Sequence, residues 1–402
     1  MTSTADVVVV GGGVVGASVA FHLAARGVTR VVLCERRWPA AGATGKSGAL
    51  VRMHYTNEPE ARLAFASLEY FQHWGDVVGA GSAGFAKTGM VRFVAPADDA
   101  KLRANVAMLR GLGVETALLE REDLRAIVPW WYVDDVAAAA YEPESGCADP
   151  VATTHGFLAR ARELGADVRL GTEVTAVRTS GDRVVGVDTS GGAIAAPAAV
   201  VAGGAWTVPM LRGLGVRATL QPMRTQVAVF RRPPAIETPH PVCIDGAYEM
   251  WLRPEGPNFF STLVGISQRQ EISDLDGWSE GVDGDYTWRA RGRMIRRIPG
   301  MADAPMRGGW AGAITLTEDG KPVIDRHPRL AGLWFCTGDN GSSFKTAPAV
   351  GRAVAEWITD GTPRVVDLHP FRASRFDEGA PLVGAHEYTI GEPDRPKGVM
   401  LG

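Results

Sequence analysis

The chain has few cysteines and no long apolar segment, and these absences exclude several classes of protein. Its 402 residues include four cysteines, widely spaced and without a C-x-x-C pair: Cys34, Cys147, Cys243 and Cys336. We therefore expect neither a disulfide framework nor a cysteine-ligated metal, and a reducing, cytoplasmic location fits this composition. No apolar run reaches the length of a membrane span. The first strand begins almost at the N-terminus, so we expect neither a signal peptide nor membrane attachment.

An excess of one charge is also lacking. The net charge of -3 gives no reason to expect nucleic acid as a partner. Lysine is rare, with six residues among the 42 lysines and arginines, so a lysine in a loop that needs no extra charge is a candidate for a specific role. The hydrophobic content of 46% and charged content of 22% are those of ordinary globular proteins. The length is enough for about two or three domains.

A glycine-rich turn between a strand and a helix is the most informative motif. The strand over 6–10 runs into the sequence GGGVVG, and a helix over 14–26 leads to a second strand over 31–35. In a G-x-G-x-x-G turn the glycines let a pyrophosphate approach the backbone at a helix N-terminus, and an acid after the next strand accepts hydrogen bonds from a ribose. We therefore predict a dinucleotide site formed by Gly11, Gly13, Val14, Val15, Gly16, Glu35 and Arg36.

Periodicity divides the rest of the chain into helices and strands. Further helices are predicted over 58–78, 98–112, 151–164, 286–298 and 346–359, and short strands over 89–94, 198–202 and 333–336. We also expect a four-stranded meander over 167–196 and an antiparallel sheet over 221–268. The stretch 121–150 has the composition of loops.

This order of elements predicts one nucleotide-binding domain built from three separated pieces: 1–85, 145–220 and 308–367. The segments 86–144 and 221–307 would form a second, substrate-binding domain, and 368–402 a C-terminal tail. A strand that returns to the first domain near the far end of the chain is typical of two-domain flavoproteins and favours FAD over NAD. The predicted fold class is α/β, with a Rossmann-like FAD-binding domain made of discontinuous segments and an α+β substrate domain around an antiparallel sheet. The cleft between the domains is the expected ligand site.

Four further motifs connect the glycine turn to a known family of enzymes. They lie at 47–52 (SGALVR), 146–150 (GCADP), 201–206 (VAGGAW) and 338–345 (GDNGSSFK). Together with the glycine turn, they resemble the FAD-dependent D-amino-acid oxidase and sarcosine oxidase family over about residues 5 to 370. These enzymes oxidise amines next to carboxylates. The resemblance implies further FAD contacts at Ser47, Gly48, Val174, Gly203, Trp206, Gly338, Asp339, Gly341, Ser342, Ser343, Phe344 and Lys345.

The same resemblance implies a clamp for a carboxylate on the substrate. Arg52 falls on the arginine that holds the carboxylate in monomeric sarcosine oxidase, and Lys345 on the lysine that shares it. A guanidinium suits this role because it binds a carboxylate through two parallel hydrogen bonds. Backbone amides in the turn before Lys345 would stabilise negative charge on the flavin. We also predict catalytic roles for Tyr55 and Tyr248, with His54, Met250 and Trp251 as further candidates for the pocket.

The chain departs from the resemblance at three places. Gly312 stands where those oxidases carry the cysteine that attaches FAD, so we expect non-covalent FAD. Leu263 is the nearest match to the lysine that activates oxygen, and no other lysine lies nearby in the sequence, which leaves the electron acceptor open. Ser267 and Ile314 replace the aromatic and histidine cage around small N-methyl substrates, so sarcosine itself is not favoured.

The leading hypothesis is an enzyme that oxidises the C–N bond of a small amino acid or secondary amine carrying an acidic group. The product would be an imine, formed by hydride transfer to the flavin, and no metal is required. One alternative is an FAD-dependent monooxygenase, which would consume NADPH. Another is a subunit of a heteromeric amine dehydrogenase or a similar complex, with the C-terminal tail docking its partner. A homo-oligomer is equally compatible with the sequence.

Overall fold

A run of valines places an early strand inside a six-stranded sheet. In the computed structural model, which describes residues 3–236 and 239–389, all four residues of β2 (Val7–Val10) are buried. Continuous apolar runs are typical of parallel strands that are covered on both faces. The order across the sheet is β20 (Val323–Arg326), β21 (Leu333–Thr337), β13 (Ala199–Val201), β2, β3 (Val31–Glu35) and β9 (Asp167–Leu170).

This sheet confirms that one fold is assembled from three pieces of chain. Val201 of β13 pairs with Val10 of β2 on one side and with Phe335 of β21 on the other. All neighbouring strands run parallel except β20, which is antiparallel to β21. The carboxyl ends of the parallel strands therefore share one edge, where ligands of open α/β sheets bind.

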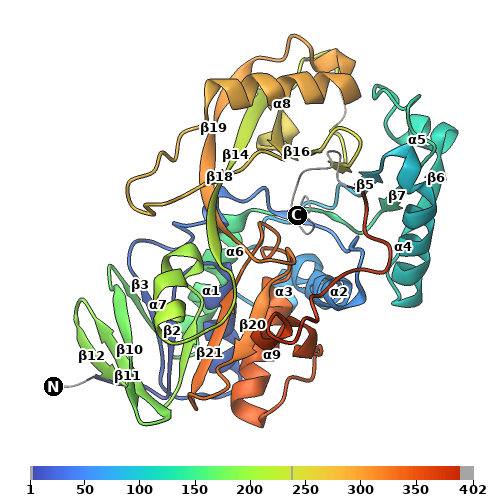
Figure 1. The fold of residues 1–402 in the computed structure, drawn as a ribbon. Coiled ribbons are helices and arrows are strands. Elements are labelled where there is room, and N and C mark those ends of the chain that lie inside the picture. The colour runs from blue at the N-terminus through green and yellow to red at the C-terminus, as the bar shows by residue number, and fades with distance from the viewer. Residues whose placement is uncertain (1–2, 237–238, 390–402) are drawn as a thin grey trace.

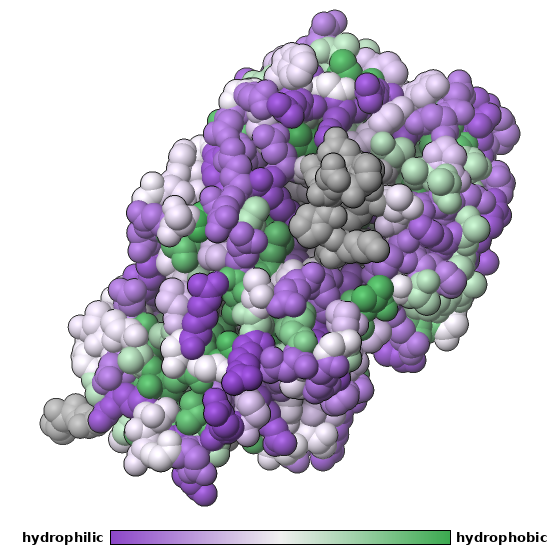
Figure 2. All heavy atoms as spheres, viewed as in Figure 1, coloured by the Kyte–Doolittle hydropathy of each residue, from purple (hydrophilic) through white to green (hydrophobic). Residues whose placement is uncertain are grey.

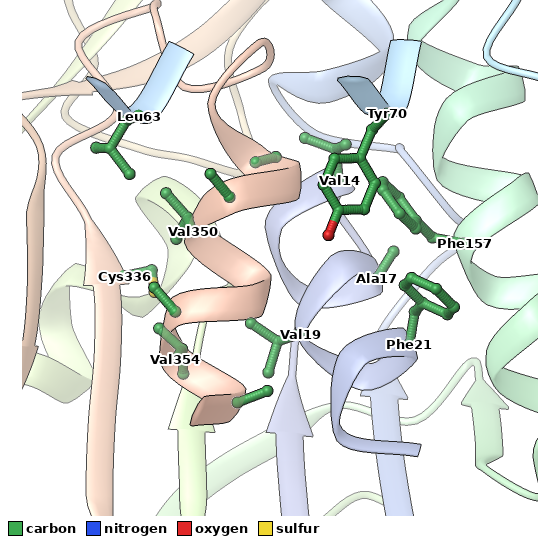
Figure 3. Close-up of a cluster of buried hydrophobic side chains, with 14 of the residues drawn as sticks. Val14, Ala17, Val19, Phe21, Leu63, Tyr70, Phe157, Cys336, Val350 and Val354 are labelled. Atoms are coloured by element: carbon green, nitrogen blue, oxygen red, sulfur yellow. The ribbon is translucent and has the colours of Figure 1, made fainter. Parts of the chain in front are cut away.

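Helix α1 (Val14–Ala25) is buried over most of its surface because other helices enclose it. It contacts α6 (Pro150–Glu163) and α9 (Ala347–Asp360). Figure 3 shows Phe21 of α1 beside Phe157 of α6, with 5.5 Å between the ring centroids. A Cβ on Gly351 of α9 would lie 2.2 Å from the Ser18 hydroxyl oxygen, so α9 needs glycine there to cross α1 closely. This packing fixes the N-terminus of α1 at the ligand edge of the sheet.

The second sheet has nine strands that come mainly from the two predicted insertions (Figure 1). Its pairs are antiparallel except for one parallel pair, β15 with β5, so it is mixed where we predicted a purely antiparallel sheet. β5 and β15 belong to different insertions, and the long connection between them permits a parallel crossover. The order is β18 (Gln270–Glu271), β14 (Gln221–Arg231), β17 (Ser261–Ile266), β16 (Met250–Glu255), β15 (Val242–Asp245), β5 (Met90–Phe93), β7 (Ala138–Glu142) and β6 (Ala117–Glu120), with β19 (Met306–Leu316) paired to β14.

Two helices cover parts of this second sheet. α8 (Gly284–Arg297) contacts β14, β16 and β17, and α4 (Asp99–Gly111) contacts β6 and β7. Hydrophilic side chains predominate over α8 on the face shown in Figure 2. Within the described part of the chain, no helix is long and apolar enough to cross a membrane.

The predicted four-stranded meander was wrong for its first strand. β9 pairs in parallel with β3 and belongs to the six-stranded sheet, because α6 returns the chain to the sheet edge as a crossover helix. The other three strands form the meander: β10 (Val174–Ser180), β11 (Arg183–Thr189) and β12 (Gly192–Ala195). Strand β1 (Ser3–Thr4) extends this small sheet by pairing in parallel with β12.

The stretch 121–150, predicted as loops, contains regular elements. α5 (Arg121–Ile127) begins at a reciprocal capping box between Glu120 and Asp123, a signal that sequence reasoning missed. β7 is rich in alanine, which has low strand propensity, and is held by its pairing with β5 and β6. β8 (Gly146–Cys147) pairs with β4 (Leu50–Val51).

Two further boundaries differ from the prediction. The helix predicted over 58–78 divides at His73 into α2 (Glu58–Gln72) and α3 (Trp74–Val77). β19 pairs with β14 along its whole length and so extends the second sheet past the predicted boundary at residue 308. We call the part built around the six-stranded sheet the first lobe and the part built around the nine-stranded sheet the second lobe. The far end of β19 still reaches the first lobe, because the Asn340 amide donates to the Thr315 carbonyl, 2.9 Å away. β19 thus joins the two lobes.

The described part of the predicted C-terminal tail, 368–389, packs against the rest of this chain. Arg375 is fully buried and donates two hydrogen bonds to the carboxylate of Asp319, at 2.7 and 2.9 Å. The Leu382 amide donates to the same carboxylate. Removing one partner of such a buried pair is strongly destabilising, since it leaves a buried charge uncompensated. Docking of a partner by these residues, as in the alternative of a heteromeric subunit, would have to use faces that this packing leaves exposed.

Candidate active site

A long cavity opens at the carboxyl ends of β2, β3, β13 and β21 and reaches β14, β17 and β19 of the second sheet. All the predicted FAD-binding residues line this cavity except Gly16 and Gly338. A Cβ on Gly16 would lie 2.0 Å from the Gly11 carbonyl oxygen, so Gly16 serves the close packing of α1. Gly338 has φ of +63°, and a Cβ there would collide with Thr317. These two glycines therefore do not line the cavity, but they allow the close packing that shapes it.

The glycine turn fits the pyrophosphate of a dinucleotide. Gly11 has φ of +107°, and a Cβ there would approach the Ala202 carbonyl oxygen to 2.7 Å. Gly13 differs, because its φ is -73° and only the Thr44 hydroxyl, at 3.2 Å, lies near an added Cβ. The fold would therefore tolerate a side chain at position 13. A phosphate that approaches the helix N-terminus needs the space that glycine leaves free there.

Glu35 is held in place at the end of β3. One carboxylate oxygen accepts from the Gly12 amide and the other from the Arg37 amide, both at 2.7 Å. This fixes the carboxylate beside the glycine turn, where it accepts hydrogen bonds from a ribose in dinucleotide-binding folds. The residues present therefore fit the adenosine half of FAD.

A loop of the second lobe, residues 274–283, binds the rim of the cavity. Asp276 accepts from the guanidinium of Arg36 at 2.6 Å and from the indole of Trp206 at 3.1 Å. The Arg36 guanidinium also lies 4.9 Å from the centre of the Trp206 ring. Lys46 forms an ion pair with Glu280 at 2.7 Å. Contacts with this loop of the second lobe thus fix Arg36 and Trp206 on the cavity wall.

The late turn before α9 is rigid and rich in hydrogen bonds. The Asp339 carboxylate accepts from the amides of Gly341, at 2.8 Å, and Thr315, at 3.1 Å. Burial raises the pKa of this carboxyl above its usual range. The Asn340 side chain accepts from the Thr317 amide at 3.0 Å. The turn is thereby fixed to β19, with Ser342, Ser343 and Phe344 on the cavity wall.

The structure brings Arg52, Tyr55 and Lys345 together. The Arg52 guanidinium lies 4.5 Å and the Lys345 ammonium 5.5 Å from the centre of the Tyr55 ring. Lys345 lines the cavity and donates to the Ser342 carbonyl at 2.9 Å, whereas Arg52 and Tyr55 are its neighbours and are not among the residues that line the cavity. Burial, and then the positive charge of Arg52, hold the pKa of Lys345 well below its usual range. Burial raises the pKa of the Tyr55 hydroxyl.

Arg52 and Lys345 have no carboxylate partner among the described residues. The nearby Glu60 forms an ion pair with Lys321 at 3.1 Å. Glu142 accepts from the Met53 amide, at 2.9 Å, and the Ser145 hydroxyl, at 2.6 Å. Arg52 is 3% exposed and its Nη1 donates to the His54 carbonyl, while its Nε has no acceptor in the described structure. Two buried basic side chains without an ion-pair partner in the described structure suit an anionic ligand.

Tyr248 does not join this cluster. Its ring lies 4.7 Å from the Arg297 guanidinium and 5.7 Å from that of Arg296, and it does not line the cavity. Arg297 is in turn paired with Asp245 at 2.7 Å in the core of the second lobe. The structure therefore does not bring Tyr248 together with Arg52, Tyr55 and Lys345, and a catalytic role for it stays a prediction.

Other cavity residues were not predicted from the sequence. Gln226 lies on β14, Arg269 follows β17, and Thr44 and Lys46 belong to the segment between β3 and β4. The Thr44 hydroxyl accepts from the Val14 amide at 3.1 Å. Gln226 reaches the cavity through the pairing of β14 with β19, which no local sequence pattern indicates. Among the described residues, no cluster of histidine, cysteine and acids could hold a metal.

Trp251 was a pocket candidate, and its place is set by two glycines. Added Cβ atoms on Gly48 and Gly265 would come within 2.4 and 2.2 Å of its indole ring. Gly48 belongs to the first lobe and Gly265 to the second. The indole thus lies between the lobes on the cavity wall, together with Ile266, Ser267 and Ile314.

Comparisons with known proteins agree with this geometry. The family model described as FAD dependent oxidoreductase (DAO) matches residues 6–357. FAD-dependent oxidoreductase domain-containing protein 1 of Mus musculus is 29% identical, covering 96% of this chain and 87% of that protein. Glycine oxidase of Geobacillus kaustophilus is 25% identical, covering 93% and 98%. The crystal structure of L-proline dehydrogenase from P. horikoshii superimposes with a TM-score of 0.87 at 26% identity, covering 95% of this chain and 100% of that one.

The fold and cavity define an FAD-dependent oxidoreductase. The chain belongs to the DAO family of FAD-dependent oxidoreductases, as its motifs indicated.

Proposed function

We propose that the protein oxidises the C–N bond of a small amino acid or secondary amine that carries an acidic group. The observation that carries this proposal is the pair of buried cations, Arg52 and Lys345, beside the FAD cavity without a carboxylate partner in the described structure. Similar proteins named sarcosine dehydrogenase, glycine oxidase and L-proline dehydrogenase support an amino-acid substrate. When bound, FAD supplies the acceptor for the two electrons taken from the carbon next to nitrogen.

The side chains of this chain bind and orient the substrate. Arg52 fixes the plane of the substrate carboxylate through its fork of N–H donors, and Lys345 adds a second charge from the cavity wall. The Tyr55 ring contacts both cations, with the Arg52 guanidinium 4.5 Å and the Lys345 ammonium 5.5 Å from its centre. Since the clamp sets the position of the carboxylate, it also sets the distance from the neighbouring carbon to the cofactor.

We propose that FAD is held without a covalent bond. Two cysteines line the cavity, Cys34 and Cys336, and burial raises their pKa to about 11 and about 12. A thiol that stays protonated is a poor nucleophile, and Gly312 stands where the related oxidases have their attachment cysteine. Acid precipitation of the yellow protein is expected to leave all the flavin in the supernatant. Flavin that stays with the pellet would contradict this proposal.

The test of the reaction is anaerobic mixing of the purified holoenzyme with sarcosine, proline, pipecolate, glycine and larger N-alkyl amino acids. Loss of the visible flavin band with one of them is expected. Readmitting air then separates an oxidase, which is reoxidised by oxygen, from a dehydrogenase, which is not. This experiment is needed because the buried Leu263 stands at the position of the lysine that activates oxygen in the related oxidases. If no amine acts but NADPH bleaches the flavin, the monooxygenase is the better function. If only an added partner restores activity, the chain is a subunit, as one relative, a sarcosine oxidase subunit beta, is named.

The lowered pKa of Lys345 predicts a pH dependence for carboxylate binding. A bound carboxylate favours the protonated lysine, so binding is tightest below the lowered pKa and weakens as the pH rises through it. The dissociation constant of benzoate, which does not titrate in this range, is measured by flavin absorbance between pH 6 and pH 10. We expect Lys345→Gln to bind more weakly and to lose this slope. Equal slopes in both proteins would exclude Lys345 from the clamp.

A further inference from the structure

The end of the described chain crosses from one lobe to the other beside the Arg52 segment. Lys321 of the first lobe binds Glu60 at 3.1 Å and Glu387 of the tail at 3.5 Å. Two residues further on, Thr389 donates through its amide and hydroxyl to Asp98, at 2.7 and 2.9 Å, and its hydroxyl accepts from the Lys101 ammonium of α4 at 3.1 Å. Figure 1 shows this red segment leaving α9 and running toward α4. The tail is thus fixed on both sides of one residue, Tyr388.

Tyr388 binds the segment that carries Arg52. Its hydroxyl lies 2.7 Å from Nε2 of His54, and the two rings are nearly parallel at 15°. Both side chains are buried, with 9% of Tyr388 and 4% of His54 exposed. The guanidinium of Arg92, from β5 of the second lobe, lies 4.8 Å from the centre of the Tyr388 ring. Tyr388 therefore contacts groups from both lobes.

His54 connects Tyr388 to the clamp. The backbone carbonyl of His54 accepts the hydrogen bond from Nη1 of Arg52. Burial and the charges of Arg92 and Arg52 hold the pKa of the His54 imidazole well below its usual range, so the ring is neutral and can pair with a hydroxyl. Among the described residues, the Tyr388 hydroxyl is the group that binds this ring. The position of the carbonyl that orients Arg52 thus depends on a contact with the tail.

We propose that Tyr388 is a positioning residue: through His54 it fixes the orientation of Arg52 for the substrate carboxylate. The C-terminal tail is then a part of the active site, although it follows the last helix of the FAD-binding fold. This inference rests on the proposed function, because it takes Arg52 as the carboxylate-binding group.

The first test is Tyr388→Phe, which keeps the ring and its packing but removes the hydroxyl. Loss of one hydrogen bond to a buried partner predicts a rise of about 5- to 10-fold in the dissociation constant of benzoate and in KM for the substrate. We expect kcat, FAD content and the unfolding temperature to stay close to wild type. Tyr70→Phe is the matched control: Tyr70 is also buried and its hydroxyl pairs with Arg352, but it lies on α2 in the core of the first lobe, so it should change neither benzoate binding nor KM.

A double-mutant cycle with Arg52→Met separates positioning from a general loss of structure. If Tyr388 acts through Arg52, the effect of Tyr388→Phe on benzoate binding disappears in the Arg52→Met background. His54→Gln, which keeps a polar group for the hydroxyl, should bind benzoate more tightly than His54→Leu. Unchanged affinity in Tyr388→Phe, or an equal effect with and without Arg52, would overturn the proposal. A wild-type holoenzyme that binds no carboxylate would instead overturn the proposed function and this inference together.

Discussion

Replacing Arg52 by alanine is expected to raise the apparent dissociation constant of the substrate by about 10²-fold, while FAD content stays unchanged. Arg52 is 3% exposed and has no carboxylate within ion-pair distance in the described structure. Truncating one partner of a buried, hydrogen-bonded charge pair costs about 2–5 kcal/mol of binding. Titration of the oxidised flavin with benzoate and steady-state kinetics with the amine both report this loss.

Two further variants make the Arg52 result specific. Arg52→Lys keeps the charge but loses the planar fork, so we expect a loss of about tenfold, between wild type and alanine. Arg62→Ala removes an exposed arginine of α2, whose ion pair with Glu58 has little effect on stability, and should leave affinity unchanged. If Arg52→Ala binds substrate as wild type does, Arg52 is not in the site.

The second large effect is expected at Gly13. Gly13→Ala should fold normally, because its φ of -73° suits any residue and only Thr44 lies near the added Cβ. The methyl group would occupy the space through which a pyrophosphate approaches the helix N-terminus. An overpacking cost of about 1–3 kcal/mol corresponds to a loss of roughly 10- to 100-fold in FAD affinity. The readouts are flavin fluorescence during reconstitution and the circular dichroism of the apoprotein.

Other glycines supply the controls for this experiment. Gly111→Ala, at the end of α4, meets nothing within 4 Å and should keep full FAD affinity. Gly11→Ala should instead disrupt folding, since Gly11 has φ of +107° and its Cβ would collide with the backbone at Ala202. FAD binding by Gly13→Ala with wild-type affinity would show that the cofactor does not approach the turn at this residue.

Local sequence patterns predicted most of the elements near the cofactor. The strand, glycine turn and helix over 6–26 are observed as β2, Gly11–Gly13 and α1, because steric limits on glycine and apolar periodicity act over a few residues. The late strand β21 also belongs to the first sheet, as predicted, and the structure shows that its neighbour there is β13. The predictions were wrong where pairing with a distant strand determines the secondary structure or the sheet that a segment joins, as for β9 and the alanine-rich β7.

The sequence by itself determined the class of this protein: a dinucleotide fold in three pieces, FAD as cofactor, and Arg52 and Lys345 as the candidate charges. Only the tertiary structure decided which side chains meet. It placed Tyr55 against both cations, placed the partly buried Tyr248 beside Arg297 of the second lobe, and brought Tyr388 to His54. The physical reason is that a motif records short-range geometry, whereas a contact between residues hundreds of positions apart depends on how all the sheets and helices bury their apolar faces together.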